Sequence, residues 1–244
     1  MWTKLQIEQH KIAAQILIKI KDEAFEFIKK QKNVTEYKVQ QFIIKKYKEN
    51  NLVTDKDPPI VAFDNNTSII HYFPTKKSKK LVKNTLILLD LWAKVKHPKA
   101  PFADITWMAY FGKKVPKEVL RNFDLIKDIR NSILRHLKKE LKKSKIPKGY
   151  ELEQITRRKL LKKGFKNKMN HYTGHCLGNK SPHGKQKHLD PKNKSSLLKN
   201  LGYTIEPGIY LPNKHGVRSE IDFYITKNLK LVITTDVQKK IIKI

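Results

Sequence analysis

The chain of 244 residues has little cysteine, few arginines and few acidic residues. Its single cysteine, Cys176, excludes an intramolecular disulfide framework. No apolar run approaches the roughly 18 residues that a membrane-spanning helix needs, and the N-terminus, MWTKLQIEQHK, lacks the apolar core of a secretory signal. No stretch rich in glycine, proline or serine divides the chain. We therefore expect one domain over residues 1–244, located in the cytoplasm.

Positive charge dominates the composition. Lysine and arginine number 53 against 22 acidic residues, which gives a formal net charge of +31. Such a charge suits a polyanion such as nucleic acid. However, 47 of the basic residues are lysines and 6 are arginines, whereas specific recognition of bases and phosphates relies on the bidentate arginine fork. The even spread of the lysines favours a solvated surface, and non-specific nucleic-acid affinity stays open.

Four helices are expected from the spacing of the apolar residues. A helical recurrence runs over residues 5–31, and Thr35 is placed to cap a second helix. A long amphipathic helix is predicted over residues 117–143. Another is predicted from about residue 152 to 163, and it ends at Gly164. The hydrophobic content of 39% is compatible with a folded domain that these helices help to form.

The remaining apolar segments are typical of strands. The expected strands, of which the second could also be only extended, are residues 58–63, 68–74, 85–93, 103–111, 203–211, 219–226 and 229–235. The run TLILLDLWA is almost continuously apolar, so it should be central in a sheet. The run ADITWMAYF is expected to be its hairpin partner. The sequence thus predicts an α/β (α+β) fold with helices on one side of a curved, largely antiparallel sheet.

Five potential metal ligands lie on or beside these strands, namely Asp90, Asp104, His175, Glu206 and Glu220. Four converging carboxylates would repel one another, and some would be forced to protonate. Two divalent cations would remove that penalty, and a mixed carboxylate and imidazole site suits Mn²⁺, Co²⁺, Fe²⁺ or Zn²⁺. Two such ions could share a water and lower its pKa. Spacing alone leaves open that each residue is a satisfied structural group.

The segments LLDLWA, ADIT, HYTGHCLG, TIEPGIYLP and GVRSE, in this order, resemble the ligand motifs of the M24 metallopeptidases, which have the pita-bread fold. The resemblance extends from about residue 5 to the end of the chain. It implies that Asp90 chelates one metal ion, that Asp104 and Glu220 bridge two ions, and that His175 and Glu206 hold the other. Glu206 would also be the general base. On this interpretation metal ions, and no cation of the chain, compensate the two aspartates.

The same resemblance assigns roles to further residues. His71, in SIIHYFP, is expected to contact the substrate or the leaving group, unless it is a surface histidine. His171 is similar to a histidine of the aminopeptidase P-like members, and His183 to one that steadies the tetrahedral intermediate. Arg218 matches the GVR-x-E pattern as a cation that orients the substrate or supports the ligands. Tyr210 is expected to contribute packing only.

Two spacings depart from the family pattern. Asp90 and Asp104 are 14 residues apart, three more than is usual. The surplus lies in KVKHPKAPF and fits a longer hairpin turn that still leaves both carboxylates on one face. His183 follows His175 by eight residues, where seven is usual. The segment between the two histidines therefore has to accommodate one extra residue.

The resemblance favours the Xaa-Pro side of the family, because IEPGIYLP and GVRSE occur together with His171. It implies a peptidase that uses two divalent ions, with Mn²⁺ first, to remove an N-terminal residue from Xaa-Pro peptides or dipeptides through a metal-bridged hydroxide. Homodimers are common in the family, and the larger members carry an additional N-terminal domain that we do not expect here. A methionine aminopeptidase and a non-catalytic pita-bread protein that binds nucleic acid stay open as alternatives.

Overall fold

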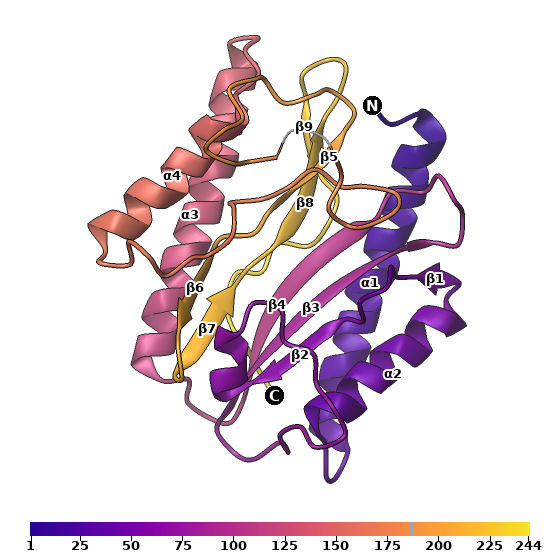
Figure 1. Cartoon of the computed structure of the whole chain (residues 1–244), viewed down its shortest axis with the longest axis vertical. Helices are drawn as coiled ribbons and strands as arrows, with labels where there is room; N and C mark the ends of the chain where they lie inside the picture. The colour runs from indigo at the N-terminus through magenta and orange to yellow at the C-terminus, as the bar shows by residue number, and fades with distance from the viewer. Residues whose placement is uncertain (186–187) are drawn as a thin grey trace.

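The computed structural model describes residues 1–185 and 188–244. Its elements are α1 (Lys4–Lys30), α2 (Glu36–Glu49), β1 (Leu52–Val53), β2 (Ile60–Phe63), the 3₁₀ helix η1 (Asp64–Ser68), β3 (Thr85–Val95), β4 (Ala103–Phe111), α3 (Lys117–Lys142), α4 (Gly149–Lys162), β5 (Gly202–Ile205), β6 (Gly208–Leu211), β7 (His215–Arg218), β8 (Ile221–Ile225), β9 (Leu231–Ile233) and β10 (Ile242–Lys243). Figure 1 shows the strands between the helix pair α1 and α2 and the helix pair α3 and α4.

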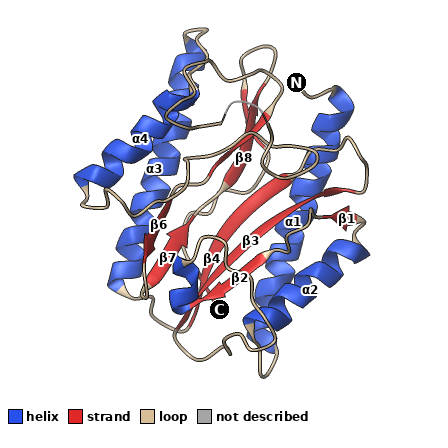
Figure 2. Ribbon diagram, in the orientation of Figure 1, coloured by secondary structure: helices blue, strands red, loops and turns tan. Residues whose placement is uncertain are grey.

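Strand β3 is central in the largest sheet, as predicted. It pairs antiparallel with β1 and β2 along one edge and with β4 along the other, and β10 adds to β4 in parallel. Strands β5, β8 and β9 form a second antiparallel sheet, and β6 pairs with β7 (Figure 2). Among the described pairings between named strands only that of the short β10 with β4 is parallel, so the predicted, largely antiparallel character is confirmed.

The two faces of the β3–β4 hairpin differ in what they contact. Ile87, Leu89 and Leu91 belong to the core cluster that α1 and α2 complete. Because side chains alternate along a strand, Asp90 lies on the opposite face. The register places Trp92 opposite Asp104, so this aspartate shares the face of Asp90. The turn absorbs the surplus residues, which confirms that both carboxylates can face one side.

The four predicted helices are present, with small differences at their ends. Thr35 caps α2 through a hydrogen bond from the Lys38 backbone N–H to its hydroxyl oxygen, 3.1 Å long. Helix α4 begins at Gly149, three residues before the expected start. Gly164 follows it with φ +80°, a conformation that favours glycine. Within the described residues no helix has both the length and the apolar content needed to cross a membrane.

Two strand predictions differ from the structure. Residues 69–74 form turns and irregular backbone after η1, so of the two predicted alternatives, a strand or an extended segment, the strand is wrong. The run 203–211 is two strands, β5 and β6, separated at Glu206 and Pro207. Proline has no N–H to donate to a ladder, and the chain changes its partner there from β8 to β7.

A buried histidine joins α1 to both sheets. His10 is 1% exposed, with Nδ1 2.9 Å from the carbonyl oxygen of Phe102 and Nε2 2.7 Å from the Thr234 hydroxyl. A carbonyl only accepts, so Nδ1 carries the proton and Nε2 accepts from Thr234. Burial, more than any other cause, lowers the pKa of His10 to about 4. The folded protein therefore keeps this imidazole neutral.

Acid should weaken the fold through His10. Between the folded pKa of about 4 and the ordinary value of 6.5, the unfolded chain binds more protons, so the free energy of unfolding falls as the pH falls. The contribution lost at pH 5 is about 2 kcal/mol relative to pH 7. Urea denaturation at both pH values should show this loss in the wild type and a smaller one in His10→Gln. Equal losses in the two proteins would contradict the assignment.

Candidate metal centre

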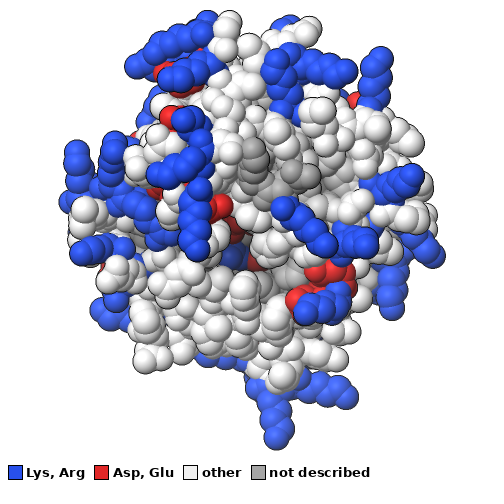
Figure 3. All heavy atoms as spheres, turned by 45° about the horizontal axis from the view of Figure 1, so that its top comes forward, with Lys and Arg blue, Asp and Glu red and all other residues white. Residues whose placement is uncertain are grey.

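A cavity of about 510 Å³ lies over the face of the hairpin that carries the two aspartates. Figure 3 shows it as a hollow with acidic and basic atoms at its base. The nine residues singled out from the sequence all line it, namely His71, Asp90, Asp104, His171, His175, His183, Glu206, Arg218 and Glu220. These residues lie between positions 71 and 220 of the sequence, and the fold brings them together around one cavity.

The tightest cluster consists of Asp104, His175 and Glu220, each buried. One ligand atom from each lies within 4.8 Å of the others. His175 Nε2 is 3.7 Å from Asp104 Oδ2 and 3.4 Å from Glu206 Oε1. Its Nδ1 lies 3.1 Å from the carbonyl oxygen of Cys176. A carbonyl only accepts, so Nδ1 carries the proton and the Nε2 lone pair faces the carboxylates, as a metal ligand requires.

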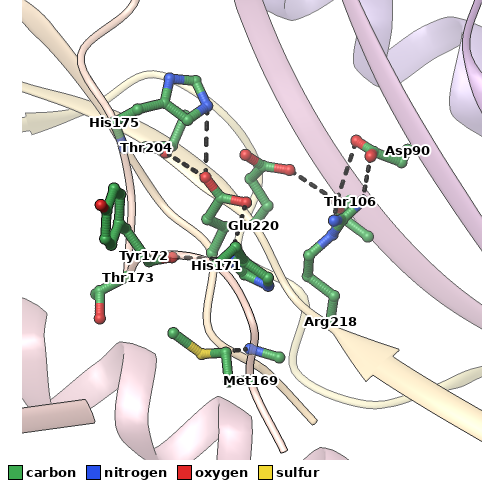
Figure 4. A network of polar contacts seen from close by, with 12 residues as sticks. Asp90, Thr106, Met169, His171, Tyr172, Thr173, His175, Thr204, Arg218 and Glu220 are labelled. Atoms are coloured by element: carbon green, nitrogen blue, oxygen red, sulfur yellow. Dashed lines mark hydrogen bonds and ion pairs between the residues drawn. The ribbon is translucent and has the colours of Figure 1, made fainter. Parts of the chain in front are cut away.

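Thr106 and Arg218 connect Glu220 to Asp90 (Figure 4). The Thr106 hydroxyl is 2.7 Å from Glu220 Oε2 and 3.2 Å from Asp90 Oδ1. The Arg218 Nε–H donates to the same hydroxyl at 2.9 Å, and its Nη2 contacts Asp90 Oδ2. The expectation that no cation of the chain compensates Asp90 is therefore wrong. Thr106 was not foreseen, although its place two residues after Asp104 puts it on the same face.

His171 and Tyr210 form a second polar contact at the cavity. His171 Nε2 is 2.8 Å from the Tyr210 hydroxyl, and its Nδ1 is 2.8 Å from the Tyr172 carbonyl oxygen. Nδ1 therefore donates and Nε2 accepts. Burial lowers the pKa of His171 to about 3, which keeps the ring neutral. Tyr210 is buried as expected, but its hydroxyl also lies 3.5 Å from Arg218, so packing alone does not describe it.

Helix α4 holds the loop that carries His171 and His175. Arg157 donates to the carbonyl oxygens of Met169 at 2.7 Å and of His171 at 2.6 Å. Its Nε–H bonds Glu153, whose other oxygen accepts the Thr173 N–H at 2.8 Å. This network fixes a segment without regular structure. Arg157 and Glu153, which hold this segment from α4, lie outside the motifs named in the sequence.

Two further histidines lie close to His175. The ring centroid of His183 is 4.2 Å from that of His175, and His183 pairs with Leu177 in an isolated bridge. The ring of His188 lies farther, at 6.4 Å. Its Nδ1 accepts the backbone N–H of Cys176 at 3.2 Å. The sequence did not single out His188, because no motif surrounds it.

Burial and mutual repulsion work against four ionised carboxylates here. Burial, followed by the charges of Glu220 and Asp90, raises the pKa of Asp104 well above its usual range. Burial also raises the pKa of Glu220 strongly, with Glu206 and Asp90 adding to the effect. Burial, as the main cause, raises the pKa of Glu206 to about 7, and the charge of Arg218 opposes this shift. The guanidinium of Arg218 therefore does not balance the charge of four carboxylates.

The donor set fits divalent cations. It offers an imidazole nitrogen with a free lone pair and four carboxylates, with no thiolate among the groups that face one another. Oxygen and imidazole donors are typical of Mn²⁺, Co²⁺, Fe²⁺ and Zn²⁺ sites. Added positive charge at this place would also reverse the rise in the carboxyl pKa values. The residues that the structure brings together are therefore compatible with a metal centre.

Comparison with known proteins gives a consistent result. The chain is 31% identical over 170 residues to an uncharacterised peptidase, YqhT, of Bacillus subtilis, an alignment that covers 68% of this chain and 44% of that protein. The solved prolidase of Thermococcus sibiricus matches with a TM-score of 0.83 at 26% identity, over 100% of this chain and 62% of that one. A dipeptidase of Pyrococcus horikoshii gives a TM-score of 0.84 at 24% identity, over 99% and 63%.

The predicted pita-bread fold is confirmed by these structural matches. The chain spans less than two thirds of the length of each of the three proteins. The model of the family described as metallopeptidase family M24 matches residues 8–227. This match includes all five candidate metal ligands and most of the sequence. The chain belongs to metallopeptidase family M24.

Proposed function

We propose that the protein is a metal-dependent peptidase that removes the N-terminal residue from Xaa-Pro peptides or dipeptides. The supporting observation is the convergence of His175 and four carboxylates in one buried cavity. The fold is shared with proteins described as a prolidase and an Xaa-Pro dipeptidase. Manganese as the native metal, a cytoplasmic location, a homodimer and non-specific nucleic-acid binding stay predictions of the sequence.

Five side chains would hold two divalent cations in this proposal. Asp90 would chelate one ion, His175 and Glu206 the other, and Asp104 and Glu220 would bridge them. When bound, such ions lower the pKa of a water and polarise a carbonyl group. The His175 tautomer and the burial of Asp90, Asp104, His175 and Glu220 support this assignment.

Glu206 would act as the general base. A carboxylate that faces both the metal site and the attacking water can move a proton between them, and Glu206 Oε1 lies 3.4 Å from His175 Nε2. The Thr204 hydroxyl lies 3.1 Å from Oε1 and orients the carboxylate. Glu206 would take the proton of the attacking water and later give it to the departing amine.

The other polar residues of the cavity would orient the peptide and stabilise negative charge on the scissile carbonyl oxygen. His71 and His183 line the cavity and would donate hydrogen bonds to that oxygen or to the leaving group. His171 accepts from Tyr210 in the present arrangement, so its role would be to orient that hydroxyl. Arg218 would hold Asp90 and Tyr210 in place.

The proposal is tested with a small peptide panel. Metal-stripped protein, titrated with Mn²⁺, is offered an Xaa-Pro dipeptide, an Xaa-Pro tripeptide and a Met-Ala tripeptide, and product amines are followed by mass spectrometry. We expect metal-dependent cleavage before proline. Release of methionine with intact Xaa-Pro bonds would indicate a methionine aminopeptidase instead. No cleavage by protein that binds Mn²⁺ would favour a binding function.

A further inference from the structure

The outer edge of β4 is satisfied by an unusual set of partners. Strand β10 pairs only with Ala109 and Tyr110 at its end. Farther back, the Gln238 side chain bonds the N–H and C=O of Met108 at 3.0 and 2.6 Å. The Thr106 carbonyl oxygen accepts the Glu220 N–H at 3.3 Å. The next outward group, the Asp104 N–H, donates to the carboxylate of Asp222 at 2.8 Å.

Asp222 is an unexpected residue at its place in β8. It is 0% exposed, and among the described residues its Oδ1 has no hydrogen-bond partner. His10 Nε2 lies 3.9 Å from Oδ2, but that nitrogen accepts from Thr234 and has no proton to donate. A buried carboxylate without a cation is costly, and a β-branched residue would suit a buried strand better. Residues that lower stability in this way are expected where function requires them.

The position of Asp222 relates it directly to the metal centre. It follows Glu220 by two residues on the same chain segment, and its Oδ2 holds the backbone of Asp104. Two residues before Asp222 in the sequence, the Glu220 N–H donates to the carbonyl oxygen of Thr106, which lies two residues after Asp104. These two hydrogen bonds join β8 to β4 on either side of the point where the Asp104 and Glu220 carboxylates meet. Without the Asp222 contact, the backbone bond of 3.3 Å and the Thr106 hydroxyl bond to Glu220 Oε2 at 2.7 Å would remain, and neither of them holds the backbone of Asp104.

We propose that Asp222 is a positioning residue that fixes β4 against β8 and thereby sets the spacing of Asp104 and Glu220 for divalent cations. The inference rests on the proposed metal site. In this role Asp222 acts through the Asp104 N–H, which its Oδ2 accepts, and not as a metal ligand. Its contribution is a hydrogen bond to the backbone of a ligand residue.

Two variants separate the hydrogen bond from the charge. Asp222→Asn keeps a side-chain oxygen that can accept the Asp104 N–H, whereas Asp222→Val removes the acceptor and suits a buried strand. Mn²⁺ binding to the metal-stripped full chain is measured by calorimetry, and thermal unfolding is followed in chelator. We expect Asp222→Val to melt no lower than the wild type but to bind Mn²⁺ about 10–100 times more weakly. Asp222→Asn should stay within about threefold of the wild type.

Gln238→Leu is the matched control, because it removes the hydrogen bonds of the same strand edge at Met108, away from the ligands. It should lower the melting temperature and leave the Mn²⁺ affinity unchanged. The positioning role would be overturned if Asp222→Val bound Mn²⁺ as tightly as the wild type. It would also be overturned if Asp222→Asn bound Mn²⁺ as weakly as Asp222→Val. Neither result would contradict the proposed metal site. Failure of the wild type to bind Mn²⁺ would overturn the proposed metal site as well. Asp222→Ala serves the same comparison if the valine variant does not fold.

Discussion

Replacement of Glu206 by glutamine should lower kcat on an Xaa-Pro peptide by roughly 10²–10⁴-fold, the usual contribution of a general base. The amide has the same shape but cannot take up a proton at neutral pH. Its oxygen can still accept the Thr204 hydroxyl, which lies 3.1 Å from Oε1 in the native side chain. We therefore expect the variant to fold and to leave the neighbouring side chains in place.

The same variant should be more stable than the wild type when metal is removed. The raised pKa of Glu206, about 7, means that the folded state binds more protons than the unfolded state above pH 4.5. The free energy of unfolding therefore falls as the pH rises to 7. An amide does not ionise, so Glu206→Gln avoids this loss. A residue retained at a cost in stability is typical of an active site.

Steady-state assays with saturating Mn²⁺ and thermal unfolding in chelator test both parts. Glu118→Gln, a change on the first turn of α3, is the control and should leave activity and stability close to the wild type. Activity within about tenfold of the wild type in Glu206→Gln would remove Glu206 from the base role. A lower melting temperature in chelator would show that its carboxylate stabilises the metal-free fold.

The charge balance at Asp90 explains why both a cation of the chain and metal ions belong in this cavity. Arg218 contacts Asp90 directly, so the chain compensates one carboxylate. Asp104 and Glu220 have no such contact in the described residues, and burial with mutual repulsion raises both pKa values. The carboxylates whose charge no side chain of the described residues compensates are therefore Asp104 and Glu220, the two that are proposed to bridge the metal ions. This is the place where divalent cations would lower the electrostatic energy most.

The predicted hairpin accounts for part of the site. A longer turn between Asp90 and Asp104 is expected to leave both carboxylates on one face, and the register agrees. Glu206 and Glu220 lie more than a hundred residues away in the sequence, so no local pattern could bring them there. Only the resemblance of their motifs to a known family connected them with the aspartates.

Other features depend on contacts that local sequence does not contain. The strand expected at 68–74 is absent, and in that segment the Tyr72 hydroxyl donates to Glu36, which lies 36 residues earlier in the chain. The hydroxyl contacts of Tyr210 depend on a loop that Arg157 holds from α4. The break at Pro207 is different, because proline itself is visible in the sequence and cannot donate to a strand ladder.

Replacement of Glu36 by alanine should produce the largest loss of stability among single changes near the cavity. Glu36 is 0% exposed at the start of α2. One carboxylate oxygen accepts the Phe63 N–H at 2.6 Å and the Asn66 side chain at 2.8 Å. The other accepts the Tyr72 hydroxyl at 2.7 Å and the Lys79 N–H at 3.0 Å. This carboxylate thus organises the segment that carries His71.

The expected loss is about 3–5 kcal/mol, because four hydrogen bonds to a charged acceptor disappear and a buried backbone N–H is left without a partner. For a chain of this size that corresponds to a fall of about 10 °C in melting temperature. Glu49→Ala removes exposed ion pairs with Lys45 and Lys46 at the other end of α2. This control should leave the melting temperature close to that of the wild type, because exposed ion pairs contribute little to stability.

The functional consequence separates Glu36 from the metal ligands. His71 lies in the segment between two of its partners, Asn66 and Tyr72, so Glu36→Ala should lower kcat/KM on an Xaa-Pro peptide below the unfolding temperature. The candidate ligands come from other elements, so Mn²⁺ affinity measured by calorimetry should stay within about threefold. A variant that loses Mn²⁺ in proportion to its activity would show that the segment supports the metal centre itself. A variant with native activity and a lowered melting temperature would show that His71 has no part in catalysis, because its placement would then not matter to the reaction.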